Sequence, residues 1–189
     1  MLTPLGVMID GATGALAPET GRYVKRLSEM RGLYRDVPAF DRDVAERGDP
    51  VVYTVIEFRK DGSDIFFGTT TMEPGAVGDE YFMTRGHFHQ RRDMGEVYYT
   101  QSGCGLLLLE SRDGQTSIVE MKPGVCAFIP PDWAHRSVNT GADKLVFVWV
   151  CNYAAGHEYG HILEHGMRKR VVARNGAPAI VDNLAPVGA

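Results

Sequence analysis

The sequence has no long hydrophobic run, few cysteines and almost no excess of charge of either sign. Hydrophobic residues fill 44% of its 189 positions but are dispersed. No stretch approaches the roughly 20 apolar residues that a membrane-spanning helix needs. The N-terminal stretch MLTPLGVMIDGATG lacks a basic segment followed by a long apolar one, so we expect no signal peptide. We therefore expect one domain with a sizeable core and no membrane partner.

The charge balance and the cysteine count exclude further classes. Twenty Lys and Arg against 24 Asp and Glu give a formal charge of −4, which favours neither nucleic acid nor an anionic membrane surface as a partner. The three cysteines, Cys104, Cys126 and Cys151, are odd in number and lack metal-type spacing. We expect three reduced thiols in a cytoplasmic protein.

From residue 51 onward the chain reads as many short strands. β-branched and aromatic runs alternate with Gly and Pro turns at regular spacing, which is typical of a sandwich or barrel. The predicted strands are 51–58, 65–72, 80–84 leading into a histidine strand, 95–100, 106–110, 116–121, 125–129, a strand starting at 137, and 144–150.

The two ends of the chain read differently. Tyr23, Leu27 and Met30 have helical spacing and predict a helix over 19–31. A second helix is expected from the cap Asp36 to about residue 48, with Pro38 in its first turn. A short helical piece is expected over 157–168, followed by strands 169–173 and 179–182 with a turn at 175–176.

The stretch from Thr84 to Gly103 carries the strongest chemical signal. In an extended strand alternate side chains share a face, so His87 and His89 point the same way. Glu96 arrives on the next strand, and a later stretch supplies His135. Three imidazoles and one carboxylate predict a site for one divalent metal ion, Fe, Mn, Ni or Zn.

A second histidine motif has a misleading form. Residues 157–161 read His-Glu-Tyr-Gly-His and match the His-Glu-x-x-His pattern of zinc metalloproteases. That pattern requires a long amphipathic helix, whereas Gly156 and Gly160 flank and interrupt this one. We therefore do not interpret it as a protease site. His161 and His165 are expected to be solvated on the outer face.

Other polar residues admit two interpretations. Threonine hydroxyls, a backbone amide beside glycine and one cation can hold a phosphate, and Thr70, Thr84, Gly86 and Arg85 supply this set. From the residues alone, strand threonines and a surface arginine would be the simpler explanation. Tyr98 shares a face with Glu96 and should point inward.

The two metal motifs resemble the cupin family. The first is Gly-x-His-x-His followed by Glu96, then six intervening residues and Gly103; the second runs from Gly124 through Pro130 and His135 to Asn139. The six-residue gap between His89 and Glu96 is similar to the archaeal-type cupin phosphoglucose isomerases, as are GDPVVY, TTTMEPG, EVYY, AGHEYG and VDN. One departure is Asp132, where many cupins carry Gly.

This resemblance implies a fold and an activity. The fold is an all-β cupin double-stranded β-helix, a single domain with an N-terminal arm over 1–50, a barrel core over 51–153 and a C-terminal helix with closing strands over 154–189. The activity is metal-dependent interconversion of glucose 6-phosphate and fructose 6-phosphate by a homodimer, with a small sugar phosphate as the partner. Two alternatives stay open: a metal-dependent oxygenase with three His and one Glu, and a non-catalytic sugar-binding cupin.

The resemblance also assigns site residues. Glu96, His135 and Tyr98 would be catalytic, and the substrate would contact Tyr53, Thr70, Thr84, Arg85, Gly86, Tyr98, His157 and Tyr159. Arg85 stands where relatives often carry Lys, which keeps the charge but changes the donor geometry. Cys151 stands where the family pattern leads us to expect Tyr, and Tyr153 lies two residues on. Glu96 has two candidate roles, metal ligand and proton-transferring base.

Overall fold

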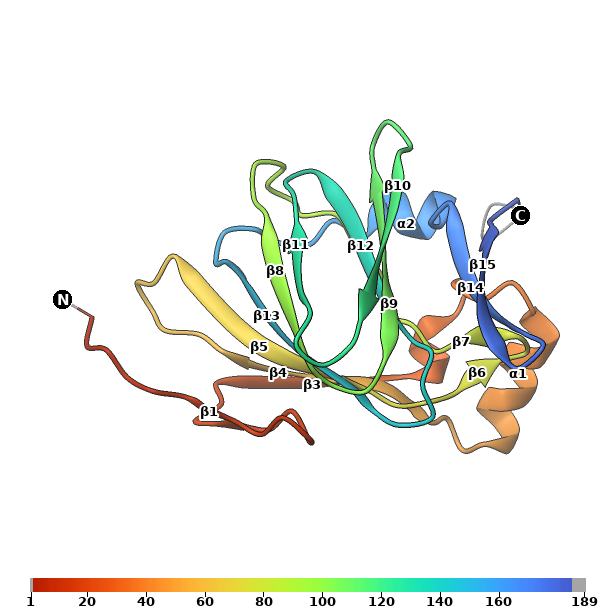
Figure 1. Ribbon diagram of the computed structural model, residues 1–189, viewed down its shortest axis with the longest axis horizontal. Coiled ribbons are helices and arrows are strands. Elements are labelled where there is room, and N and C mark those ends of the chain that lie inside the picture. The colour runs from red at the N-terminus through yellow and green to blue at the C-terminus, as the bar shows by residue number, and fades with distance from the viewer. Residues whose placement is uncertain (1, 185–189) are drawn as a thin grey trace.

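A computed structural model of the chain describes residues 2–184 (Figure 1). The strands are β1 Met8–Ile9, β2 Leu16–Ala17, β3 Gly21–Arg26, β4 Val51–Phe58, β5 Ile65–Met72, β6 Ala76–Val77, β7 Glu80–Tyr81, β8 Glu96–Ser102, β9 Gly105–Ser111, β10 Thr116–Met121, β11 Cys126–Ile129, β12 Trp133–Asn139, β13 Leu145–Asn152, β14 Lys169–Arg174 and β15 Ala177–Asp182. The helices are the 3₁₀ turn η1 Leu27–Met30, α1 Val37–Glu46 and α2 Gly160–His165.

Two facing sheets form the barrel. One has six strands in the order β11-β8-β13-β5-β4-β3, and the other has three in the order β10-β9-β12. A small sheet, β15-β14-β7-β6, gathers beside α1 at the side of the barrel away from the N-terminal hairpin β1-β2 (Figure 1). This arrangement confirms the predicted all-β fold. No helix among residues 2–184 is long and apolar enough to span a bilayer.

The inner faces of the sheets supply one core. Phe82, Phe88, Phe147, Leu107 and Ile129 are each no more than 1% exposed and belong to one cluster of buried side chains. That cluster runs from the N-terminal arm to β14, so the arm and the closing strands share the core of the barrel. The C-terminal region expected to reach residue 189 is described only to 184.

Strand alternation determines which polar groups enter the barrel. In β8 the buried positions are Glu96, Tyr98 and Thr100, while Val97 and Tyr99 face outward. The next strand in the sheet, β13, places Trp149 opposite Tyr98 and Cys151 opposite Glu96. The period of two therefore brings a carboxylate, a phenol and a thiol to the same inner surface, as expected for Tyr98.

The predicted helix over 19–31 is wrong. Residues 21–26 form β3, which extends the six-stranded sheet by pairing with β4, and Tyr23 lies opposite Val55. The helical spacing arose because Leu27 and Met30 are both buried by the 3₁₀ turn that follows the strand. Pairing with an existing sheet edge outweighs the weak local preference of a short segment.

Two other predictions for the ends of the chain are confirmed, and a third is wrong in its bounds. Asp36 caps α1 by accepting a hydrogen bond from the Ala39 amide at 2.9 Å. Asn175 and Gly176 both have positive φ and close the β14–β15 hairpin. The C-terminal helix is shorter than predicted, because α2 starts only at Gly160 and ends at His165.

Candidate metal centre and pocket

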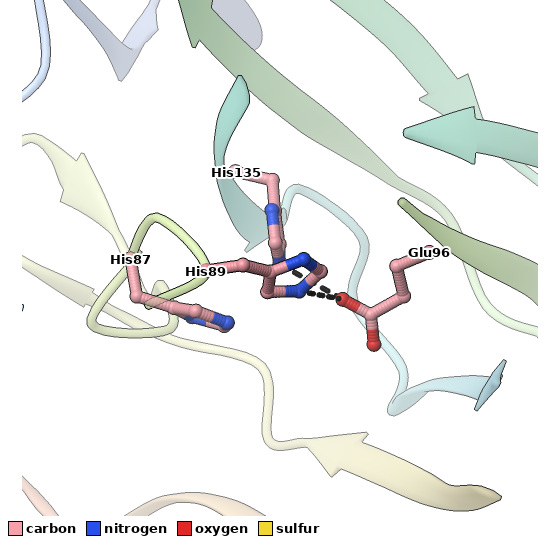
Figure 2. A group of neighbouring side chains, drawn as sticks. All are labelled: His87, His89, Glu96 and His135. Atoms are coloured by element: carbon pink, nitrogen blue, oxygen red, sulfur yellow. Dashed lines mark hydrogen bonds and ion pairs between the residues drawn. The ribbon is translucent and has the colours of Figure 1, made fainter. Parts of the chain in front are cut away.

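His87, His89, Glu96 and His135 converge inside the barrel (Figure 2). One ligand atom from each of the four lies within 4.8 Å of all the others. The segment carrying His87 and His89 is extended, but it pairs only through isolated bridges and is not the regular strand that we expected. The bridge between His87 and His135, with backbone hydrogen bonds of 3.3 and 3.1 Å, places two of the imidazoles side by side.

Hydrogen bonds orient the group. Glu96 Oε2 lies 3.2 Å from His89 Nε2 and 3.1 Å from His135 Nε2, and His89 Nδ1 is 2.9 Å from the Met94 carbonyl oxygen. Burial raises the pKa of Glu96, but hydrogen bonds from His135 and His89 outweigh it, and the net pKa falls below 4.5. The cluster therefore holds an ionised carboxylate among imidazoles.

The surroundings of His87 strongly disfavour its protonated form. Burial first, and then the neighbouring His135, His157 and His89, lower its pKa well below 6.5, so it is neutral. Its Nε2 is buried without a hydrogen-bond partner within residues 2–184. A buried, unpartnered nitrogen facing two other imidazoles and a carboxylate suits a divalent cation, because a cation would satisfy that lone pair.

The cluster opens into a cavity of about 440 Å³. His87, Glu96 and His135 line it, whereas His89 does not and contacts the group from behind. All of the other residues that the sequence proposed for the site also line it: Tyr53, Thr70, Thr84, Arg85, Gly86, Tyr98, His157 and Tyr159. Their grouping around one cavity gives the proposed ligands and the proposed substrate contacts a common space.

One wall of the cavity is the segment from Thr84 to Gly86. Thr84 Oγ1 accepts a hydrogen bond from the Ser137 amide at 3.0 Å, and the Arg85 carbonyl accepts one from Arg136 Nη2 at 2.6 Å. Gly86 has φ +74°, and a Cβ there would lie 3.1 Å from Arg136 Nε. A side chain at residue 86 is therefore disfavoured both by the strain of its positive φ and by the close approach of Arg136.

The His157–Tyr159 segment forms another wall. Reciprocal backbone hydrogen bonds of 3.0 and 2.8 Å join Glu158 to Phe88, so the two flanking side chains turn toward the cluster. The His157 ring lies 4.3 Å from the His87 ring and is stacked on Tyr159 at 5.6 Å. Because His157 precedes α2 while His161 lies on it, these two histidines do not share a helix face, unlike the metalloprotease pattern.

Sequence reasoning missed several residues of the cavity wall. Tyr23 and Lys25 enter from β3, which the helical interpretation had concealed. Arg59 lies with its guanidinium 4.3 Å above the Phe66 ring and is bonded to Glu57 at 2.8 Å. Tyr23 and Lys25 are two positions apart, which is the spacing of residues on one face of a strand, and this pattern could have identified both. Trp149 and Phe147 also line the wall.

Cys151 also lines the cavity, as the neighbour of Glu96 in the sheet. Burial, with Glu96 nearby, raises the pKa of its thiol. Tyr153 lies outside the lining, is 44% exposed and contacts Phe66 edge-on at 5.8 Å. Tyr153 therefore does not bring a phenol to the place of the tyrosine that the resemblance led us to expect.

The chain is similar to known proteins over nearly its full length. A family model described as glucose-6-phosphate isomerase matches residues 24–184. A glucose-6-phosphate isomerase of Thermococcus gammatolerans is 43% identical, covering 95% of each chain. A putative glucose-6-phosphate isomerase 2 of Rhizobium meliloti is 42% identical, covering 95% of this chain and 90% of the relative. Among solved structures, oxalate decarboxylase from Bacillus subtilis matches 56% of this chain and 26% of its own, with 22% identity and a TM-score of 0.46.

Proposed function

The chain belongs to the glucose-6-phosphate isomerase family, and from that premise we propose that it interconverts glucose 6-phosphate and fructose 6-phosphate with one bound divalent metal ion. The metal is Fe, Mn, Ni or Zn, held by His87, His89, Glu96 and His135. The observation that carries the proposal is the shared cavity of about 440 Å³. Three of the four candidate metal ligands line it, as do groups that could donate hydrogen bonds to a phosphate, and the fourth ligand lies within 4.8 Å of the other three.

The phosphate binds at the Thr84–Gly86 wall. Thr70 and Thr84 offer hydroxyls, Gly86 offers its amide, and Arg85 adds a cation. Arg85 lies 5.6 Å above the Tyr159 ring, which holds its guanidinium beside the cavity. Tyr53 and His157 contact the sugar between the phosphate and the metal cluster. A fixed phosphate orients the remote end of the sugar toward Glu96.

The isomerisation moves a hydrogen between C1 and C2, and in this proposal it moves as a proton through an enediolate. Glu96 is the base that moves it, because its carboxylate faces the cavity and is ionised. The metal supplies Lewis-acid stabilisation of negative charge on the sugar oxygens next to the reacting carbons. His135 and Tyr98 flank Glu96, with their rings 5.7 Å apart, and they position the substrate against the carboxylate while keeping water out.

A coupled assay tests the activity. Protein stripped with a chelator should not convert fructose 6-phosphate, and adding Mn, Fe or Ni should restore turnover. A panel that includes mannose 6-phosphate determines which epimers are accepted. Full turnover by chelated, metal-free protein would contradict the proposal. Oxygen consumption would indicate the oxygenase alternative, and binding without any turnover would indicate a sugar-binding cupin.

The phosphate assignment has its own test. Thr84→Ala removes one donor to a remote group, so KM should rise while kcat changes little. The expected loss in kcat/KM is about 1–3 kcal/mol. Free fructose should be a poor substrate for the wild-type protein. Equal turnover of fructose and fructose 6-phosphate would refute a phosphate site.

The role of Glu96 is separated from a hydride shift by isotope labelling. Proton transfer predicts that turnover in D₂O places deuterium on the carbon that receives the proton. Glu96→Gln keeps one oxygen ligand but removes the basicity, so kcat should fall by roughly 10²–10⁴ at saturating metal. A product free of solvent deuterium, together with near wild-type kcat in the variant, would leave Glu96 as a ligand only.

The protein is a homodimer in this proposal. The outer face of the six-stranded sheet exposes Phe128 by 67%, Tyr99 by 43% and Val150 by 38%, on the adjacent strands β11, β8 and β13. Such an apolar sheet face favours burial against a second copy. Light scattering should give twice the 20.8 kDa of one chain. Phe128→Asp should weaken the dimer, whereas Leu163→Asp on α2 should not; a stable wild-type monomer would refute it.

A further inference from the structure

The histidines of α2 form a pair outside the pocket described above. His161 and His165 are four residues apart on the helix, so they share one face. Their ring centroids are 4.9 Å apart with planes inclined by 62°. The rings of the metal cluster itself are separated by 4.3 to 5.7 Å. The α2 pair therefore has the spacing of imidazoles that can reach one ion.

Both histidines line a second cavity, of about 450 Å³. The remaining lining residues are Glu110, Gly166, Arg168, Asn183 and Leu184, none of which lines the first cavity. Glu110 is only 4% exposed and brings a carboxylate to this space. Its Oε2 accepts the Arg168 amide at 2.6 Å, and its Oε1 lies 3.4 Å from Arg168 Nε. The arginine charge is thus balanced within the cavity wall.

The rings of His161 and His165 make few other contacts. His161 contacts Phe88 edge-on at 5.4 Å. Within residues 2–184 no hydrogen bond engages its ring nitrogens, and His165 Nε2 has only an exposed contact with Glu164 at 3.6 Å. His161 is less exposed than expected, because it is half-buried beside Phe88 and His165, whereas His165 is exposed as expected. A half-buried imidazole with free nitrogens beside a second one is a ready pair of ligands.

We propose that His161 and His165 bind a second divalent transition-metal ion. Two imidazoles at i and i+4 suit Zn, Ni or Cu, which favour nitrogen ligands, and water completes the coordination. The Glu110 carboxylate and the Asn183 side chain line the same cavity, but they are already bonded to Arg168 and Arg170, so the two imidazoles are the protein ligands. This site does not depend on the isomerase activity, because it shares no ligand with the His87 cluster.

The α2 pair is connected to the first cluster through Phe88. Phe88, on which His161 packs, lies between His87 and His89 in the chain, and Glu158 is bonded to it on both backbone groups. Tyr159, a wall of the pocket, immediately precedes α2. An ion that ties His161 to His165 therefore stiffens the helix that follows the pocket wall, and the protein should gain thermal stability with metal concentration through this site.

The test is a metal count on the full chain. Equilibrium dialysis against excess Zn or Ni, followed by elemental analysis, should give one more ion per chain for the wild type than for His165→Gln. Glu164→Gln, the neighbouring substitution outside the cavity lining, is the matched control and should keep the full count. His165 has a side chain 55% exposed, so its variant should fold.

The comparison between variants keeps this proposal separate from the proposed function. If the His87 cluster binds no metal, every count falls by one but the difference between wild type and His165→Gln persists. Equal counts in the wild type, His165→Gln and the double variant His161→Gln/His165→Gln would overturn the second site. So would a metal-dependent rise in melting temperature that is the same in all three proteins.

Discussion

Arg136 is a buried cation directly behind the proposed phosphate wall, and removing it should weaken substrate binding. It is 3% exposed, and its Nη2 donates to the Arg85 carbonyl at 2.6 Å. Burial, with Arg170 nearby, lowers its pKa to about 10, so it stays charged at neutral pH. The Arg85 carbonyl and the Gly86 amide belong to one peptide group. Donation to that oxygen polarises the peptide and strengthens the Gly86 N–H as a donor into the cavity.

The magnitude follows from the type of bond that is lost. A hydrogen bond to a charged group contributes about 1.5–3 kcal/mol. Arg136 is one peptide removed from the phosphate, so Arg136→Met should lose part of that, on the order of 1.4 kcal/mol, or tenfold in KM for fructose 6-phosphate. The value of kcat should stay within about twofold, because Arg136 does not reach the reacting carbons. The KM of Arg136→Lys should lie between those of the wild type and Arg136→Met, because lysine keeps the charge but lacks the planar guanidinium with its several donors.

The assay is steady-state kinetics with the coupled reaction, alongside inhibition by inorganic phosphate. Phosphate should inhibit the Met variant more weakly by the same factor. Metal content and melting temperature serve as controls, because His135 precedes Arg136 and a merely structural defect would lower both metal content and kcat. An unchanged KM and phosphate inhibition constant in a folded, metal-replete Met variant would refute the link between Arg136 and the phosphate wall.

Three further outcomes are expected. Burial lowers the pKa of His89, but hydrogen bonds to Glu96 and Met94 outweigh it and raise the pKa above 6.5. Protons should therefore compete with the metal for His89 already above that pH. The metal affinity measured by titration should fall steadily toward pH 5, and a flat profile would contradict this. A thiol reagent should modify the two exposed cysteines quickly and Cys151 slowly, because that thiol is buried with a raised pKa; three equal rates would contradict the structure. Asp36→Ala should cost about 1 kcal/mol through the lost cap, seen as a melting temperature lower by about 2–4 °C.

Local patterns predicted the fold where one period dominated. The strands over 51–58 and 65–72 match β4 and β5, because β-branched residues there are bounded by turns. The N-terminal segment failed because two elements share one apparent period: Tyr23 belongs to a strand, whereas Leu27 and Met30 belong to a 3₁₀ turn. Only pairing with β4, a contact distant in sequence, distinguishes these interpretations.

In the candidate site, too, local spacing predicted some residues, whereas others depend on contacts distant in sequence. The spacing of the histidine motifs brought His87 and His89 together with Glu96 in advance, because backbone alternation and one short loop fix their relative positions. Arg59 could not be placed, since its position depends on stacking against Phe66 from another strand. Cys151 was identified as a departure from the family pattern, but only the sheet register reveals that it lies beside Glu96.

Asp132 makes the loop between His89 and Glu96 sensitive to salt. Asp132 has φ +64°, a conformation that glycine adopts without strain. Its Oδ1 accepts from Arg92 Nε at 3.0 Å and from Arg112 Nε at 2.8 Å, and Arg92 belongs to the loop between His89 and Glu96. A glycine here would form no ion pair with the loop. The Asp132 carboxylate pairs with Arg92 and Arg112, and dissolved salt screens these attractions. At this position the protein accepts a strained backbone conformation in a non-glycine residue, and in return it gains ion pairs to the loop that weaken as the ionic strength rises.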